Sequence, residues 1–299
     1  MSKQASKVQT LADAVALIPD GTRLALGGFA IYQHPMALVR ELVRARRRDL
    51  TIVGTVNGNE VDMLVGAGCV RTVETSYVGL ERFGLAPNFR RAVEAGELSV
   101  VDYPEILSFD RFRATQEAMT FWPCDYLGGT DVLRYNPAIK SFACPLTGRM
   151  LYAVPPANPE VVVIHAIAAD EQGNVLFPRR HLLPQGLDSI MARGCDTVIV
   201  TVESIVSKQF VKRHADLNLL PSYKVTMVVE APFGAHPCPV LGRYRIDDAH
   251  FTEYANAAKN VDSFADYLER YVLSPADHAA YLDLIGAQQL TALLETDTL

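Results

Sequence analysis

Short runs of β-branched residues alternate along the chain with longer segments whose apolar residues recur at helical spacing. Two of the short runs are apolar on both faces, which is typical of central strands that are covered on each side. The alternation predicts an α/β fold, with an open, largely parallel sheet and helices on both faces. The clearest predicted strands cover residues 23–26, 50–53, 161–166, 197–202 and 225–229.

Three segments have the apolar spacing of amphipathic helices. The first runs from Pro35 to about Arg47, because proline suits the first helical position and apolar residues recur behind it. The second covers residues 187–193 and is followed by Gly194, where we expect a left-handed cap. The third has a stripe that is typical of core packing, formed by Phe264, Tyr267, Leu268 and Tyr271.

The middle of the chain, residues 103–156, is richer in proline, glycine and aromatic residues and is harder to assign. We expect it to form an irregular excursion that shapes one wall of an active site. The sequence has no internal repeat, low-complexity tract or linker. The simplest organisation is therefore one domain over residues 1–299.

The composition permits a full α/β core, because 49% of the 299 residues are hydrophobic and 21% are charged. The formal net charge of -6 argues against a broad nucleic-acid surface, which needs clustered cations. No apolar stretch approaches the ~20 residues of a membrane span, and the polar first residues lack the apolar core of a signal peptide. We therefore expect a cytoplasmic protein.

The five cysteines are scattered along the chain, with no Cys-x-x-Cys pair and no histidine pair nearby. This pattern predicts no zinc site, and no metal-ligand cluster is found elsewhere in the sequence. We expect reduced thiols that fill small apolar sites. Cys238 is the exception to examine, because it lies beside a predicted turn at residues 234–237.

A pair of glycines marks the end of the first predicted strand. Asp20-Gly21 is typical of a turn, and Gly27-Gly28-Phe29 ends the strand abruptly before the helix at Pro35. Ligands of open α/β sheets bind beyond the carboxyl ends of strands, where glycine lets the backbone approach a ligand. The pattern is neither a dinucleotide fingerprint nor a phosphate-binding P-loop, and by itself it is also compatible with a plain tight turn.

The longer string from Asp20 to Phe29, followed six residues on by Pro35, resembles the signature of the alpha subunits of family I CoA-transferases. Gln33 stands where that pattern often has glycine, a departure that favours the glutaconate CoA-transferase branch. Three further segments are similar to alpha chains of that branch, at residues 61–68, 89–96 and 231–237. The resemblance implies the open parallel sheet of the CoA-transferase and NagB-RpiA-like proteins.

The resemblance also implies a shared active site. Family I transferases carry the acyl group on a glutamate, which in heteromeric members belongs to the beta chain within a Glu-Asn-Gly motif. This sequence has no Glu-Asn-Gly, and its nearest phrase, at residues 57–60, has another order. We therefore expect a beta-type partner subunit, in an α2β2 assembly by family analogy. The implied substrates are an acyl-CoA and a carboxylic acid, with coenzyme A as substrate and no other cofactor.

By resemblance, Gly27, Gly28 and Phe29 line the acyl pocket together with the turn at Asn57 and Gly58, and their N–H groups are available to an oxyanion or carboxylate. Asn57 is equally compatible with a plain turn residue.

Two histidines and a glycine lie near other predicted strands. Beside Gly234, His236 either hydrogen-bonds a substrate carboxylate or buttresses its loop. His165, inside an apolar strand, is expected to be a satisfied core histidine.

Glu105 is the most informative titratable residue. Related alpha chains of the steroid-ring-cleaving hydrolase type place a functional glutamate in the matching stretch, where it would act as a general base. It is also compatible with a surface glutamate after Pro104. Three functions follow: the alpha subunit of an acyl-CoA:carboxylate CoA-transferase; a subunit that hydrolyses, ring-opens or decarboxylates a CoA thioester; or a non-catalytic ligand-sensing module.

Overall fold

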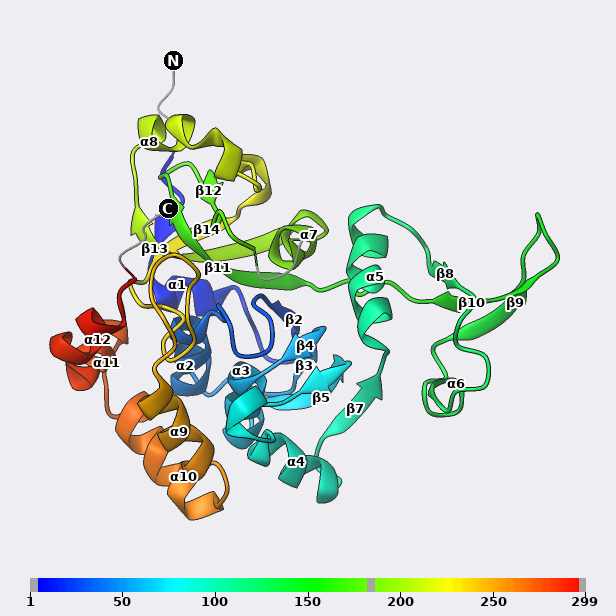
Figure 1. The fold of residues 1–299 in the computed structure, drawn as a ribbon, viewed down its shortest axis with the longest axis horizontal. Helices are drawn as coiled ribbons and strands as arrows, with labels where there is room; N and C mark the ends of the chain where they lie inside the picture. Colours follow the sequence, from blue (N-terminus) through cyan, green and yellow to red (C-terminus); the bar gives the residue numbers. More distant parts are fainter. Residues whose placement is uncertain (1–4, 182–185, 296–299) are drawn as a thin grey trace.

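The computed structural model describes residues 5–181 and 186–295, which are organised around one large twisted sheet (Figure 1). Its strand order is β1-β14-β13-β11-β2-β3-β5-β7, with β12 beside β11. Neighbours along this path are parallel, and β12 is antiparallel to β11. The strands are β1 (Val8–Gln9), β2 (Arg23–Leu26), β3 (Leu50–Val53), β5 (Val70–Thr75), β7 (Ser99–Asp102), β11 (Val161–Ala169), β12 (Val175–Leu176), β13 (Thr197–Ile205) and β14 (Met227–Glu230).

Alternate residues of the central strands supply two separate cores. In β2, Leu24 and Leu26 join one apolar cluster, whereas Ala25 joins the cluster on the opposite face. Every residue of β11 is buried, as expected for a strand that is covered on both faces. The predicted parallel sheet with helices on both faces is confirmed.

One face of the sheet is covered by the helices that carry most of the first cluster. They are α1 (Leu11–Ala16), α2 (Met36–Arg44), α3 (Asn59–Gly66), α9 (Asp248–Ala257), α10 (Val261–Leu268) and the π-helical turn Glu269–Leu273. Further helices complete this side of the chain: α4 (Pro87–Glu94), α11 (His278–Ile285) and α12 (Ala287–Leu293).

The other face packs against α5 (Glu105–Gln116) and α7 (Leu187–Arg193), while α8 (Lys208–Arg213) packs near β12. Within the described residues, no helix is both long enough and apolar enough to span a membrane.

Several sequence predictions of secondary structure are confirmed and others need correction. The strands at 23–26 and 50–53 and the helix at 187–193 have the predicted bounds, and the aromatic stripe near the C-terminus is buried. Pro35 precedes α2 as its N-cap, so it is not the first helical residue. Gly194 is right-handed (φ -83°), so the predicted left-handed cap is wrong. The last strand begins at Met227, because Val225 N–H closes a turn onto Ser222.

The cysteines of the described chain are free thiols, and all but Cys144 are buried. Cys238 is fully buried, and its thiol donates to Asn59 Oδ1 at 3.1 Å. Burial raises the pKa of this thiol far above its usual range. A thiol that stays protonated is a poor nucleophile, so Cys238 packs in the core and is not a reactive group.

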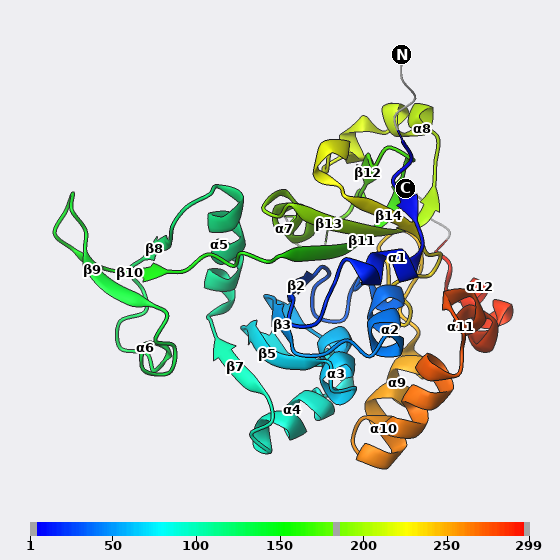
Figure 2. The same cartoon turned by 180° about the vertical axis from the view of Figure 1, so that it is seen from behind.

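The predicted excursion is narrower than residues 103–156, because its first part is the regular helix α5. The remainder forms a small antiparallel sheet of order β8-β10-β9 that projects away from the main sheet (Figures 1 and 2). A short helix, α6 (Val132–Tyr135), lies beside it. The strands of this arm are β8 (Trp122–Cys124), β9 (Lys140–Ala143) and β10 (Met150–Val154).

One partly buried carboxylate ties α5 and the returning end of the arm to the sheet. Glu74, on β5, binds Arg23 of β2 through two hydrogen bonds of 2.6 and 2.7 Å. It also accepts from Arg111 of α5 at 2.6 Å. The two arginines then donate to the backbone carbonyls of Ala157 and Pro155, respectively. Burial alone would raise the pKa of Glu74, but these two guanidinium groups lower it.

Glu74→Gln should destabilise the fold by about 3 kcal/mol, because it leaves two partly or fully buried guanidinium groups without their counter-charge. Urea unfolding at neutral pH measures the loss. A lowered carboxyl pKa stabilises the fold above the unfolded value of about 4 and loses that contribution as pH falls. The difference between the two proteins should therefore shrink in acid. The control is Glu94→Gln, because Glu94 forms an exposed pair with Arg90 whose loss should leave the midpoint unchanged. Equal midpoints for both variants would refute the central role of Glu74.

Candidate active site

The strand-end glycines form a tight turn whose N–H groups are already paired. Gly28 has φ +95°, a left-handed conformation that favours glycine. Gly27 N–H donates to Val163 O at 2.7 Å, Gly28 N–H to Asp188 Oδ1 at 2.9 Å and Phe29 N–H to Tyr32 O at 3.0 Å. The expectation that these donors are free for an oxyanion or carboxylate is therefore wrong for this chain by itself.

Phe29 stands where three hollows of the surface meet. The first is also lined by Gly28 and Asp188, and the third by residues 30–32. The second is an open hollow of about 490 Å³ between the turn, the end of β7 and the start of α5. Phe29 thus lines these hollows, and its contact with a ligand stays a prediction.

The second hollow is acidic. Glu81, Asp102 and Glu105 line it beside Tyr77. Burial raises the pKa of Asp102, and that of Tyr77 is raised by burial and by the charge of Glu81. Within residues 5–181 and 186–295, no group of three His, Cys, Asp or Glu side chains could hold a metal ion.

Glu105 is the first residue of α5, follows Pro104 and is exposed to solvent. Both interpretations made from the sequence remain compatible with this position. Its carboxylate lies in the first helical turn, where the helix dipole stabilises a negative charge, and it also lines the second hollow.

Asp188 accepts the hydrogen bond of the Gly28 N–H and was not predicted from the sequence. It lies in the first turn of α7, partly buried, and lines the first hollow. Burial raises its pKa, and the Gly28 hydrogen bond opposes that shift. Only the packing of α7 against the end of β2 brings these two residues together.

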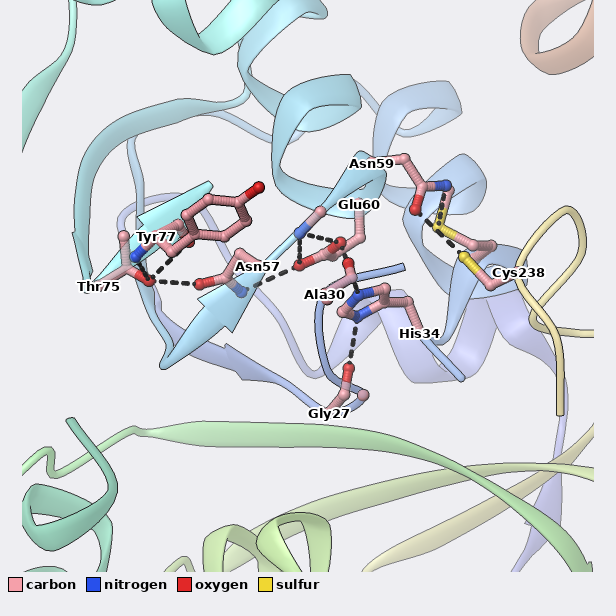
Figure 3. Close-up of polar contacts among 12 residues, drawn as sticks. Gly27, Ala30, His34, Asn57, Asn59, Glu60, Thr75, Tyr77 and Cys238 are labelled. Carbon is pink, nitrogen blue, oxygen red and sulfur yellow. Dashed lines mark hydrogen bonds and ion pairs between the residues drawn. The ribbon is translucent and has the colours of Figure 1, made fainter. Parts of the chain in front are cut away.

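The second predicted loop, Asn57-Gly58, lies against the first (Figure 3). Asn57 is 2% exposed, and its side chain donates to Glu60 at 2.9 Å and accepts from Thr75 at 2.7 Å. It is thus neither a ligand contact nor a plain turn residue, but an internal tie. A Cβ atom on Gly58 would overlap Ala30 O, so glycine is required here by close approach.

His34 and Glu60 lie in the centre of this arrangement, and the sequence reasoning missed both (Figure 3). The His34 ring contacts Gly27 O and Ala30 O, each at 2.8 Å, and lies 3.1 Å from Glu60 Oε2. Glu60 accepts in turn from Gly58 N–H at 2.9 Å. The pair therefore joins the two predicted loops. The sequence signals for this pair were a histidine immediately before the helix proline and a glutamate two residues after the Asn-Gly turn.

Gly234 and His236 belong to the core and not to a ligand pocket. His236 is 0% exposed, and its ring nitrogens lie 2.7 Å from Tyr281 Oη and 3.1 Å from Asp247 Oδ2. Gly234 is buried where a Cβ atom would crowd Ala231 O. Of the two roles considered for His236, the structure supports buttressing, and the assignment of these two residues to substrate binding is wrong. His165 is satisfied by Thr201 and Glu203, as expected for a core histidine.

A family model described as Coenzyme A transferase matches residues 8–231. The chain belongs to the coenzyme A transferase family. The A subunits of two known transferases are close relatives. That of the 3-oxoadipate CoA-transferase of Pseudomonas knackmussii is 32% identical over 92% of this chain and 97% of its own length. That of the glutaconate CoA-transferase of Acidaminococcus fermentans is 30% identical over 96% of this chain and 94% of its own length.

Two further relatives are a hydrolase subunit and an uncharacterized protein. The IpdA subunit of the cholesterol ring-cleaving hydrolase of Rhodococcus jostii is 27% identical over 93% of this chain and 95% of its own length. An uncharacterized protein of Archaeoglobus fulgidus is 32% identical over 96% of this chain, which spans 64% of that protein's length.

Solved structures agree with the fold. The crystal structure of glutaconate CoA-transferase from Acidaminococcus fermentans superposes with a TM-score of 0.92 at 29% identity, over 97% of this chain and 96% of the other. A variant of the decarboxylase AibA/AibB gives 0.77 at 31% identity, over 89% of this chain and 100% of the other. The chain is thus an A-type member of a family that contains transferases and hydrolases.

Gly58→Ala should destabilise the protein by about 1–3 kcal/mol, because the new methyl group must push the two loops of the site apart. The matched control is Gly128→Ala, where the nearest neighbour of the added Cβ is the flexible end of Tyr152 at 3.1 Å. Thermal unfolding of both variants measures the difference. A Gly58→Ala protein as stable as the control would show that the loops do not need this close approach.

Proposed function

We propose that this chain is the alpha subunit of a heteromeric acyl-CoA:carboxylate CoA-transferase and acts with a beta-type subunit that supplies the catalytic glutamate. The observation that carries the proposal is the open hollow beside Phe29, at the carboxyl end of β2, in a family member whose sequence contains no Glu-Asn-Gly. This chain thus lines the hollow but does not itself carry the Glu-Asn-Gly motif that would supply the nucleophile. The two transferase relatives at 30–32% identity support the same assignment.

In the proposed reaction, the glutamate carboxylate of the beta-type partner attacks the thioester carbon, and the CoA thiolate leaves. The thiolate then attacks the glutamyl carbonyl of the resulting anhydride, which releases the first acid and leaves a glutamyl-CoA thioester. The acceptor carboxylate repeats these two steps in reverse order. The present chain contributes the wall: Phe29 packs against the acyl group, and the fixed turn around it excludes water.

The same hollow supports a second candidate, a hydrolase or decarboxylase of CoA thioesters. The specific observation is that Glu105 lines the hollow from the start of α5, where its carboxylate could activate water. The similarity of this chain to a decarboxylase structure and to one chain of a hydrolase also supports this second candidate.

The assembly and the cellular location are parts of the proposal. An α2β2 complex in the cytoplasm is what we expect from the sequence. Co-expression of this chain with the beta-type chain encoded beside it, followed by mass determination of the complex, tests the stoichiometry.

The transferase proposal predicts a trapped intermediate. The purified complex should form a glutamyl-CoA adduct with an acyl-CoA, sensitive to borohydride or hydroxylamine, and should release the second acyl-CoA only when an acceptor acid is added. CoA released at the same rate without acceptor, with no adduct, would contradict transfer and favour hydrolysis.

Glu105→Gln separates the two candidates. If the complex transfers acyl-CoA, the variant should keep its turnover within a few-fold, because the nucleophile lies in the partner. If the complex hydrolyses a thioester with Glu105 as base, turnover should fall by about 100-fold or more. Glu117→Gln is the matched control, since Glu117 is exposed at the far end of the same helix. Full hydrolysis by Glu105→Gln would remove this residue from the catalytic set.

A further inference from the structure

His34 lies beneath the strand-end turn, immediately before Pro35 and α2, and its side chain is fully buried. Its Nδ1 faces Gly27 O and its Nε2 faces Ala30 O, each at 2.8 Å (Figure 3). A carbonyl oxygen can only accept a hydrogen bond, and a neutral imidazole has a single N–H. A neutral ring would therefore direct a bare nitrogen lone pair at one of the two carbonyl oxygens.

Glu60 supplies the matching negative charge. Its side chain is also fully buried, and one of its carboxylate oxygens lies 3.1 Å from His34 Nε2. The remaining partners of this carboxylate, Gly58 N–H and Asn57 Nδ2, are donors. A carboxylate surrounded by donors is stabilised in its ionised form. The local hydrogen bonds are thus complete only with an imidazolium and a carboxylate.

Among residues 5–181 and 186–295, two other titratable groups lie near His34. Asp188, on α7, is reached through the Gly28 N–H and adds a second acidic group on that side. Cys238 contacts the His34 backbone, and burial keeps its thiol protonated and neutral. Neither group opposes a positive charge on the ring.

We propose that His34 is a doubly protonated imidazolium paired with Glu60 and that it is a positioning residue for the strand-end turn of the site. The ring holds both ends of the turn, at Gly27 and at Ala30. Gly27 C=O and Gly28 N–H belong to the same peptide group, so donation to the carbonyl also polarises the N–H toward Asp188. The positioning role rests on the proposed function, since it assumes that this turn faces the substrate.

The protonation state can be measured on the full chain alone. In nitrogen-15 spectra at about pH 7, His34 should show two protonated ring nitrogens. His250 is the internal control: it is buried, its Nε2 contacts Tyr267 Oη at 2.8 Å, and burial lowers its pKa to about 3. It should show one protonated nitrogen. A His34 spectrum of the same neutral type would overturn the ion pair. Because this measurement uses the unmodified chain, it does not depend on whether a variant folds.

The positioning role is tested by comparing His34→Gln with His250→Gln. Hydrogen exchange at the Gly28 and Ala30 amides should accelerate in His34→Gln only, because only that variant releases the turn. With the beta-type partner, kcat of His34→Gln should fall by about 100-fold, a loss typical of a misplaced site wall, while KM changes little. His250→Gln should lose thermal stability without either effect.

Glu60→Gln should convert His34 to the neutral ring and give no additional loss of kcat when combined with His34→Gln. Identical amide exchange in the two histidine variants would overturn the positioning role, whatever the activity. If exchange changes as expected but no acyl-CoA is turned over by the unmodified complex, the proposed function fails while the role of His34 in holding the turn stands.

Discussion

Two loops at the ends of neighbouring strands approach so closely that no side chain fits between Gly58 and Ala30 O, and the rest of the site follows from this approach. A loop buried in this way cannot satisfy its backbone polar groups with water, so partners must come from within the chain. The ring nitrogens of His34 contact the carbonyl oxygens of one loop, and the carboxylate of Glu60 accepts from the N–H of the other. Because the two side chains carry complementary polar groups, the loops are joined by one buried pair.

The elements of the sheet were predictable because their information is local. The β-branched runs at 23–26 and 50–53 form strands with those bounds, and the alternation of strands and helices requires the parallel order that is found. The errors occur where tertiary contacts decide. Gly194 is not a left-handed cap; a Cβ atom added to it would lie 3.1 Å from Gln116 N, so glycine suits the close packing at this position. A sequence pattern cannot separate these two uses of glycine.

The sequence identified two loops that lie close together but not the partners of their polar groups, and their contact with a substrate stays a prediction. The two loops at residues 27–29 and 57–58 do meet, and Phe29 does line surface hollows. The sequence, however, suggested free backbone donors, whereas Asp188 occupies the Gly28 N–H from a helix about 160 residues away. His236 had the residue type of a ligand group but is enclosed by the C-terminal helices. Residue type and spacing identify which loops matter, and only packing decides which of their atoms are free.

Polar contacts of buried and partly buried side chains hold both walls of the second hollow. On one side the His34 and Glu60 pair fixes the turn that carries Phe29, and on the other Arg111 binds Glu74 and stacks 3.8 Å from the Tyr103 ring, which lines the same hollow. We expect these directional hydrogen bonds to orient the two elements more strictly than apolar packing alone would. Under the proposed function this orientation is established during folding, before substrate arrives. The chain then contributes a preorganised wall to the reaction, and the acyl group and the partner's nucleophile need only fit against it.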